Sequence, residues 1–258
     1  MNRIGCCVAH DRISAARQAG YAYAELSVAG SLCPLEDEAW WRGRRAEIEA
    51  GGLPILATNV FFPGEWRLVG PQGDLAATRR YAEAAVRRAA ELGVRVMVMG
   101  SGGARRVPDG FPREAALDQF RATLAMLGDV AAPHGITIAL EPLRRAETNL
   151  VHTVAEGLEV VRRLGHPHVA VLADLYHMQE EQEPLDDVVA AGRLLAHVHV
   201  ADTGRLAPGT GQYDYPGFFA RLRRVGYQGG VSVECKWQDW TREAPAARAF
   251  LEQMAAGR

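Results

Sequence analysis

The stretch "HVAVLADLYHMQEEQEPLDDVVAAGRLLAHVHVAD", residues 168–202, contains two apolar runs separated by a polar stretch. The runs 168–175 and 194–202 are almost continuously apolar, which is typical of parallel strands that are buried on both faces. The segment 184–192 between them fits a short helix. A strand, a helix and a second strand in this order predict a unit in which the two strands lie parallel.

The same alternation extends through the chain. Six further apolar runs predict strands at 3–8, 21–28, 53–62, 94–100, 136–142 and 229–235. Longer amphipathic stretches between and after the strands predict the other helices at 12–20, 34–51, 73–93, 112–135, 153–165, 216–226 and 242–256. This pattern predicts a single-domain α/β fold, a (β/α)8 TIM barrel spanning residues 1–258. A doubly wound sheet is the alternative, but no G-x-G-x-x-G motif opens the first helix.

The composition narrows the classes of partner. The formal net charge is −2, whereas a nucleic-acid-binding protein usually carries a basic stripe, so we expect no nucleic-acid partner. No apolar run reaches the roughly 18 residues of a membrane span, and the N-terminus lacks the apolar region of a signal peptide. The four cysteines show no C-x-x-C spacing, which favours reduced thiols. We therefore expect a cytoplasmic protein that has no membrane partner.

Four potential metal ligands stand at the ends of four consecutive predicted strands. They follow the apolar runs "ITIAL", "HVAVLA", "LLAHV" and "GGVSV" and are Glu141, Asp174, His199 and Glu234. Polar residues at strand C-termini face the active site of a barrel, and buried carboxylates must be paired, protonated or metal-bound. Three carboxylates and one imidazole favour one divalent cation, with Mn²⁺ first and Mg²⁺ or Co²⁺ as alternatives. His197 lies on the same strand face as His199, and we expect it to be structural or to support the ligand.

Further polar residues follow the same strand ends. Glu147, His177 and Arg205 come six, three and six residues after Glu141, Asp174 and His199. Because loops at this end of a barrel carry function, these residues are candidates for binding a polar small molecule.

Three other features of the sequence bear on the predicted active site. Glu25, at the end of a strand, either lines the barrel mouth or braces the barrel. The aromatic residues Phe61, Phe62 and Trp66 are candidates for covering a substrate. The Gly-rich segment "GSGGARRVPDGF" (100–111) either cradles a phosphate or carboxylate with Arg105 and Arg106, or is a turn whose arginines face solvent or brace the barrel.

The motifs "NVFFPG" (59–64), "EPLRRAETNLVHT" (141–153), "DLYHM" (174–178), "HVHVADTGRLAPGTGQYDY" (197–215) and "GYQGGVSVEC" (226–235) span most of the predicted barrel. With these motifs the chain resembles the xylose isomerase-like TIM-barrel superfamily, in particular its branch of ketose 3-epimerases and hydroxypyruvate isomerase. The resemblance implies a metal site formed by Glu141, Asp174, His199 and Glu234. It also implies that Glu141 and Glu234 are the catalytic acid/base pair, and that Glu147, His177 and Arg205 bind substrate.

This resemblance implies a metal-dependent isomerase or epimerase of carbohydrate metabolism. Its substrate would be a ketose, a sugar derivative or a small hydroxyketone, converted through an enediolate that the metal holds. A homo-oligomer is expected by analogy alone. The chain departs from the ketose epimerases in having Arg144-Arg145 where these commonly have Asn-Arg, and in the segment 100–111.

Three alternatives remain open from the sequence. The first is a lyase or dehydratase of the same superfamily, such as an inosose dehydratase, a dehydroshikimate dehydratase or a 3-keto-C-glycoside lyase. The second is a non-catalytic sugar-binding barrel, which the presence of both glutamates disfavours. The third, an AP endonuclease, would require three metal ions and more histidines.

Overall fold

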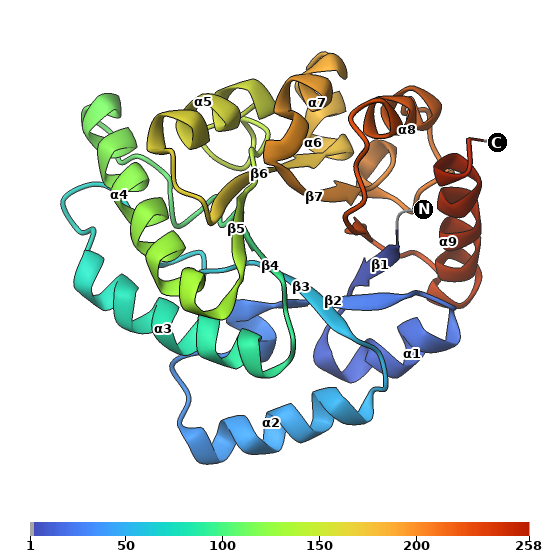
Figure 1. Cartoon of the computed structure of the whole chain (residues 1–258), viewed down its shortest axis with the longest axis horizontal. Helices are drawn as coiled ribbons and strands as arrows, with labels where there is room; N and C mark the ends of the chain where they lie inside the picture. The colour runs from blue at the N-terminus through green and yellow to red at the C-terminus, as the bar shows by residue number, and fades with distance from the viewer. Residues whose placement is uncertain (1–2, 258) are drawn as a thin grey trace.

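Eight parallel strands pair in chain order and close into a barrel, because β8 also pairs with β1 (Figure 1). This computed structural model describes residues 3–257. The strands are β1 Ile4–Cys7, β2 Tyr23–Ser27, β3 Ile55–Asn59, β4 Val96–Met99, β5 Thr137–Leu140, β6 Val169–Asp174, β7 Leu195–Val200 and β8 Val231–Val233. Each of them lies within a predicted apolar run. The closed order confirms the (β/α)8 barrel and excludes the doubly wound sheet.

Helices surround the barrel in the order in which they leave the strands (Figure 1). They are α1 Ile13–Gln18, α2 Glu38–Ala50, α3 Leu75–Glu91, α4 Arg113–Ala131, α5 Val154–Leu164, α6 Leu175–Glu180, α7 Asp186–Ala191, α8 Tyr215–Arg224 and α9 Trp240–Ala255. Short 3₁₀ turns lie at His10–Arg12, Ala132–His134, Gly192–Leu194 and Thr203–Arg205, and a π turn lies at Val28–Leu32.

Helix α6 was not predicted. His177, which was expected in a loop, lies in this helix, and the helix begins directly after β6. Asp174 caps the helix, since its Oδ1 accepts a hydrogen bond from the backbone N–H of Tyr176 at 2.8 Å. The cap fixes the position of Asp174 at the rim of the barrel.

The barrel interior is divided into an apolar and a polar part. Val98, Ala139 and Leu172 are fully buried and form a small cluster on the side of β4, β5 and β6. On the opposite side, Glu25 accepts hydrogen bonds from His197 and Ser232. Outward-facing strand residues pack beneath the helices in two larger apolar clusters. The interior layer therefore supports the rim residues with apolar contacts on one side and a hydrogen-bond network on the other.

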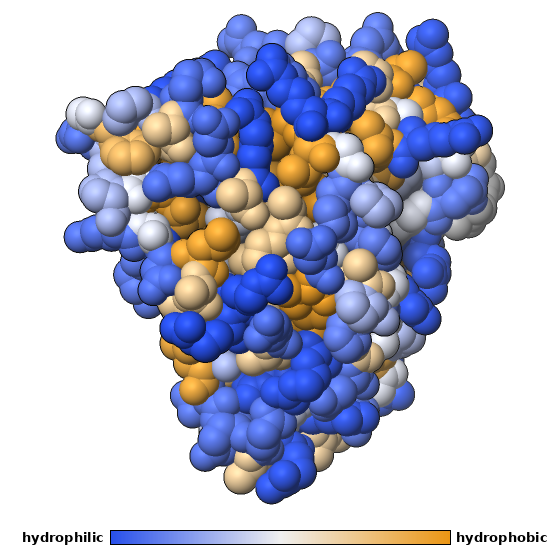
Figure 2. Space-filling model, turned by 60° about the vertical axis from the view of Figure 1, so that its left-hand side comes forward, coloured by the Kyte–Doolittle hydropathy of each residue, from blue (hydrophilic) through white to orange (hydrophobic). Residues whose placement is uncertain are grey.

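The surface is mainly hydrophilic, and on the face shown in Figure 2 apolar residues form interrupted stretches among polar ones. Among residues 3–257, the large hydrophobic side chains that are exposed are Leu35, Val60 and Leu75. No helix in the described part of the chain is long and apolar enough to cross a membrane.

Replacement of Leu172 by alanine tests the apolar part of the interior. Leu172 is fully buried two residues before Asp174, so L172A should leave a cavity directly below the rim. We expect it to lower the free energy of unfolding by about 2–5 kcal/mol, measured by chemical denaturation. The control L172M keeps most of the volume and should cost less than about 1.5 kcal/mol. Equal stability of L172A and the wild type would contradict a packed interior.

Candidate metal centre and active site

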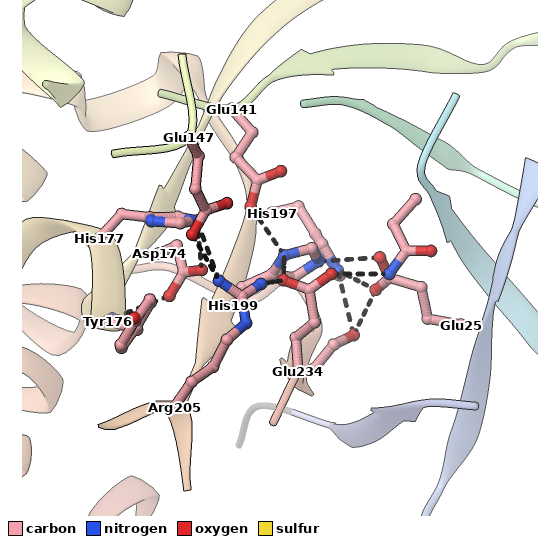
Figure 3. Close-up of polar contacts among 12 residues, drawn as sticks. Glu25, Glu141, Glu147, Asp174, Tyr176, His177, His197, His199, Arg205 and Glu234 are labelled. Atoms are coloured by element: carbon pink, nitrogen blue, oxygen red, sulfur yellow. Dashed lines mark hydrogen bonds and ion pairs between the residues drawn. The ribbon is translucent and has the colours of Figure 1, made fainter. Parts of the chain in front are cut away.

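The four predicted ligands meet at the C-terminal rim of the barrel. One ligand atom each from Glu141, Asp174, His199 and Glu234 lies within 4.8 Å of the others. Figure 3 shows His199 between Glu141 and Glu234, which approach it from different sides. The Nδ1 of His199 is 3.1 Å from Glu141 Oε1 and 3.5 Å from Glu234 Oε2. Three carboxylates and an imidazole at this spacing form a donor set that fits one divalent cation.

Glu141 directly follows β5 and is supported by the loop after β4. A Cβ on Gly100 would lie 2.2 Å from Glu141 Oε2, so glycine is needed for this close approach. The fully buried Arg105 donates a hydrogen bond from Nη2 to the backbone carbonyl of Glu141 at 2.8 Å. The exposed Arg106 donates to the carbonyl of Glu147 at 3.1 Å. Both arginines therefore brace the loop after β5, in agreement with the second interpretation of the segment 100–111.

His177 lies beside Asp174 because both belong to the junction of β6 and α6. Its Nε2 is 3.5 Å from Asp174 Oδ2, and both side chains are buried. The backbone N–H of Arg144 points at Nδ1 at a distance of 3.4 Å. The other ring nitrogen, Nε2, lies 3.4 Å from Arg205 Nη1, so both nitrogens of His177 face donors of neighbouring arginines.

Glu25 is the residue whose role the sequence left open. It is fully buried one layer below the cluster, where its Oε1 accepts a hydrogen bond from His199 Nε2 at 2.8 Å. Its Oε2 lies 2.8 Å from His197 Nε2 and 2.6 Å from Ser232 Oγ. Glu25 thus braces the barrel and also orients His199, since it occupies Nε2 and leaves Nδ1 facing Glu141 and Glu234. His197 belongs to this supporting layer, as expected.

Arg205 connects two carboxylates and an aromatic ring at the mouth. Its Nη2 donates to Glu234 Oε2, its Nη1 is 3.6 Å from Glu147 Oε1, and its guanidinium lies over the Tyr176 ring at 5.0 Å. The other oxygen of Glu234 accepts a hydrogen bond from Asn59 Nδ2 at 3.0 Å. The structure therefore brings Glu147, His177 and Arg205 together next to the cluster, and it adds Asn59 and Tyr176. The sequence signal for both additions was their position at or just after a strand end.

The environments of the two glutamates shift their pKa values in opposite directions. Burial raises the pKa of the Glu141 carboxyl above its ordinary value, against the lowering effect of His199. Burial also favours the neutral form of Glu234, but the positive charges of His199 and Arg205 outweigh it and lower the pKa of that carboxyl to about 2. Burial lowers the pKa of His199, yet Glu25 and Glu234 outweigh this effect and raise it. The ring is therefore held between acidic groups on both sides.

Several residues other than glycine have strained backbone conformations in the loops at the rim. Val60, Ser101, Val151 and Arg205 all have positive φ angles, of 43°, 40°, 62° and 61°. They lie in the loops that follow β3, β4, β5 and β7. Such conformations cost about 1–3 kcal/mol each in residues other than glycine, and they concentrate at functional sites.

The aromatic residues proposed to cover a substrate have a different role. Phe61 and Phe62 are fully buried, and Trp66 packs on the rings of Phe62 and Tyr81, with its Nε1 donating to Thr78 Oγ1 at 3.1 Å. The expectation for these three residues was wrong, because helix α3 offers them an apolar surface. Tyr176 is the aromatic residue that lies beside the site.

Comparison with known proteins agrees with this geometry. A family model described as Xylose isomerase-like TIM barrel matches residues 13–254. The chain belongs to this family. This confirms the resemblance at the level of the superfamily, and the curated relatives are epimerases or isomerases of sugars and sugar derivatives.

Two curated relatives and one solved structure define how far the similarity to this xylose isomerase-like barrel extends. The 3-dehydro-D-guloside 4-epimerase of Escherichia coli (strain K12) is 30% identical over 82% of this chain and 81% of that protein. The L-ribulose 3-epimerase of Methylomonas sp. (strain DH-1) is 39% identical, but the match covers 44% of this chain and 40% of the relative. A D-psicose 3-epimerase structure obtained in the presence of D-fructose superposes with a TM-score of 0.85 at 20% identity, over 99% of this chain and 100% of that chain, which shows a shared fold.

Replacement of Glu25 by glutamine tests its support of His199. A glutamine amide at this position no longer provides a carboxylate for His199 Nε2, and loss of such a partner typically weakens metal binding 10- to 100-fold. We expect E25Q to lower the affinity for Mn²⁺ by about this factor in isothermal titration calorimetry.

The control for this experiment is E147Q, which removes a mouth carboxylate outside the four-residue cluster. Its affinity for Mn²⁺ should stay within about threefold of the wild type, since second-layer and ligand carboxylates are the groups that tune the metal. Wild-type affinity in a folded E25Q protein would show that Glu25 only fills the barrel.

Proposed function

We propose that this chain is a divalent-metal-dependent epimerase of keto sugars or related hydroxyketones, with Mn²⁺ as the metal. The observation that carries the proposal is the cluster of three carboxylates and one imidazole, in which Glu141 and Glu234 approach His199 from different sides. An epimerase needs two groups that exchange protons with opposite faces of one carbon atom. The two glutamates provide such a pair.

Glu141, Asp174, Glu234 and the Nδ1 of His199 would hold the cation. When bound, the cation polarises the carbonyl of the substrate and acidifies the neighbouring C–H bond. The hard, mostly oxygen donor set favours Mn²⁺ over a thiolate-preferring metal.

In the proposed reaction one glutamate removes the proton from the carbon beside the carbonyl. The other glutamate returns a proton to the opposite face of the same carbon, so that the configuration inverts and the composition is unchanged. Glu234 is held ionised by Arg205 and His199, which suits it to accept a proton. The Glu141 carboxyl lies against Gly100, where the absence of a side chain leaves room for it to face the reacting carbon.

Substrate hydroxyl groups would be bound by Glu147, His177 and Arg205. Glu147 and Arg205 are partly exposed at the mouth, whereas His177 is buried against Asp174. Arg205 offers donors and Glu147 an acceptor, which suits a polyol that presents both kinds of group. The relatives favour epimerisation over elimination, because their names describe epimerases of L-ribulose, D-psicose and 3-dehydro-D-guloside and an isomerase of 2-oxo-tetronate.

Proton exchange in D₂O tests the roles of the two glutamates. Mn²⁺-loaded wild-type protein should incorporate deuterium beside the carbonyl of ketoses or 3-keto-glycosides, as followed by NMR. E141Q and E234Q should each lower the rate of exchange by about 10²- to 10⁴-fold, because general acid–base groups contribute factors of this size. The exposed Glu65 provides the control, and E65Q should exchange at the wild-type rate.

The products of the same experiment separate the candidate reactions. An inverted sugar supports epimerisation, whereas loss of a β-substituent would identify a lyase or dehydratase. Wild-type exchange in either glutamine variant would refute the assignment of that glutamate.

Removal of the metal is a separate test. A chelator should abolish exchange, because the cation no longer acidifies the C–H bond of the substrate. It should also lower the melting temperature of the protein, because three adjacent carboxylates, two of them buried, then repel each other. Both properties should return on addition of Mn²⁺. Exchange that persists after exhaustive chelation would exclude a metal-dependent reaction.

A further inference from the structure

Among the 29 lysine and arginine residues of the chain, Lys236 is the single lysine. It stands two residues after Glu234, in the segment that leads from β8 to α9. Its side chain is exposed. An isolated lysine next to a candidate active site, in a chain that otherwise uses arginine, raises the question of what it binds.

The hydrogen bonds of this segment show where Lys236 lies. The backbone N–H group of Glu234 donates to the carbonyl of Val200, the last residue of β7, at 3.0 Å. The backbone N–H group of Lys236 donates to the carbonyl of Arg205 at 2.7 Å. Cys235, between them, packs against the apolar layer outside the barrel. Lys236 is therefore held next to Arg205, at the mouth.

The segment that carries Lys236 is anchored beyond this residue as well. The ring of Trp237 packs against that of Trp240 at a centroid distance of 5.0 Å. The backbone N–H groups of Gln238 and Asp239 donate to Glu243 Oε2. The backbone on both sides of Lys236 is therefore fixed by contacts with the rest of the protein.

Two arginines beside the candidate site, Arg144 and Arg205, are already matched by carboxylates. Arg205 pairs with Glu234 and Glu147, and Arg144 pairs with Glu147 and Glu180. Within the described residues 3–257, the ammonium group of Lys236 has no such partner. Its charge is thus available to a ligand, whereas the two arginines are held by the protein.

We propose that Lys236 binds an anionic group of the substrate, a carboxylate or a phosphate, on the β8 side of the metal site. The proposal rests on the proposed function, because it places the reacting carbon at the four-ligand cluster and the anionic end of the molecule at the mouth. A lysine suits this task, since its flexible stem and compact charge can follow a terminal group that moves during the reaction.

Binding of unreactive analogues tests the proposal without turnover. The probes are erythronate, a carboxylate; erythritol 4-phosphate, a phosphate; and erythritol, which is neutral. None has a carbonyl group. Titration of Mn²⁺-loaded wild-type protein should show tighter binding of at least one anion than of erythritol. K236M should weaken binding of that anion about 10- to 100-fold, as expected for loss of a charge-assisted hydrogen bond, and K236R should restore part of it.

The matched control is R193M, which removes an exposed positive charge from the turn directly before β7, at the end of the barrel opposite the mouth. It should bind both anions like the wild type. Preference for erythronate identifies sugar acids as the substrate class, and preference for erythritol 4-phosphate identifies sugar phosphates. Equal anion affinity in wild type and K236M, or wild-type binding of erythritol as tight as that of both anions, would overturn the role of Lys236.

The outcome of the anion-binding titrations can be distinguished from the outcome of the proton-exchange test of the proposed function. If E141Q and E234Q exchange protons like the wild type, the epimerase mechanism fails, yet selective loss of anion binding in K236M would still locate an anion site at the mouth. Conversely, exchange-active protein whose anion affinity does not depend on Lys236 would refute only the lysine site.

Discussion

Three carboxylates and an imidazole crowd together at one end of the barrel, and this crowding is the constraint on which the rest of the structure depends. Glu141, Asp174 and His199 are buried, and Glu234 is half-buried. Like charges this close repel each other, and their removal from water adds a further cost. The protein places Arg205 on Glu234, a helix N-terminus on Asp174 and His199 between Glu141 and Glu234. A divalent cation would neutralise the negative charge that remains on the carboxylates. The site is therefore polar, whereas the contacts between the strands and the surrounding helices are apolar.

The layer beneath the cluster shows how this polarity is supported. His199 has two ring nitrogens, and Glu25 binds one of them so that the other faces the rim. Glu25 in turn is held by His197 and Ser232. A network in which every member is satisfied gives His199 one orientation, which an apolar interior could not do. On the other side, Leu172 and its neighbours fill the barrel without polar groups.

The loops at the rim add a third level of support. Gly100 leaves space for Glu141, and the buried Arg105 ties the loop after β4 to the carbonyl of Glu141. Arg205 holds its guanidinium between Glu147 and Glu234 from a strained backbone position. Lys236 lies next to Arg205, just after β8, and its ammonium group has no carboxylate partner within residues 3–257. Positive charge beside the candidate site is thus divided between arginines that hold its carboxylates and an exposed lysine that we propose binds a ligand.

Local patterns in the sequence determined the barrel and the positions of the four candidate ligands, because strand alternation and apolar runs depend on near neighbours along the chain. Glu141, Asp174, His199 and Glu234 could be found since each ends such a run. Only the tertiary structure decided that Glu25 orients His199, that Arg105 braces the loop of Glu141, and that Phe61 and Phe62 belong to the core. These roles arise from contacts between residues far apart in the chain, whose geometry depends on strand stagger and loop paths that no local pattern encodes.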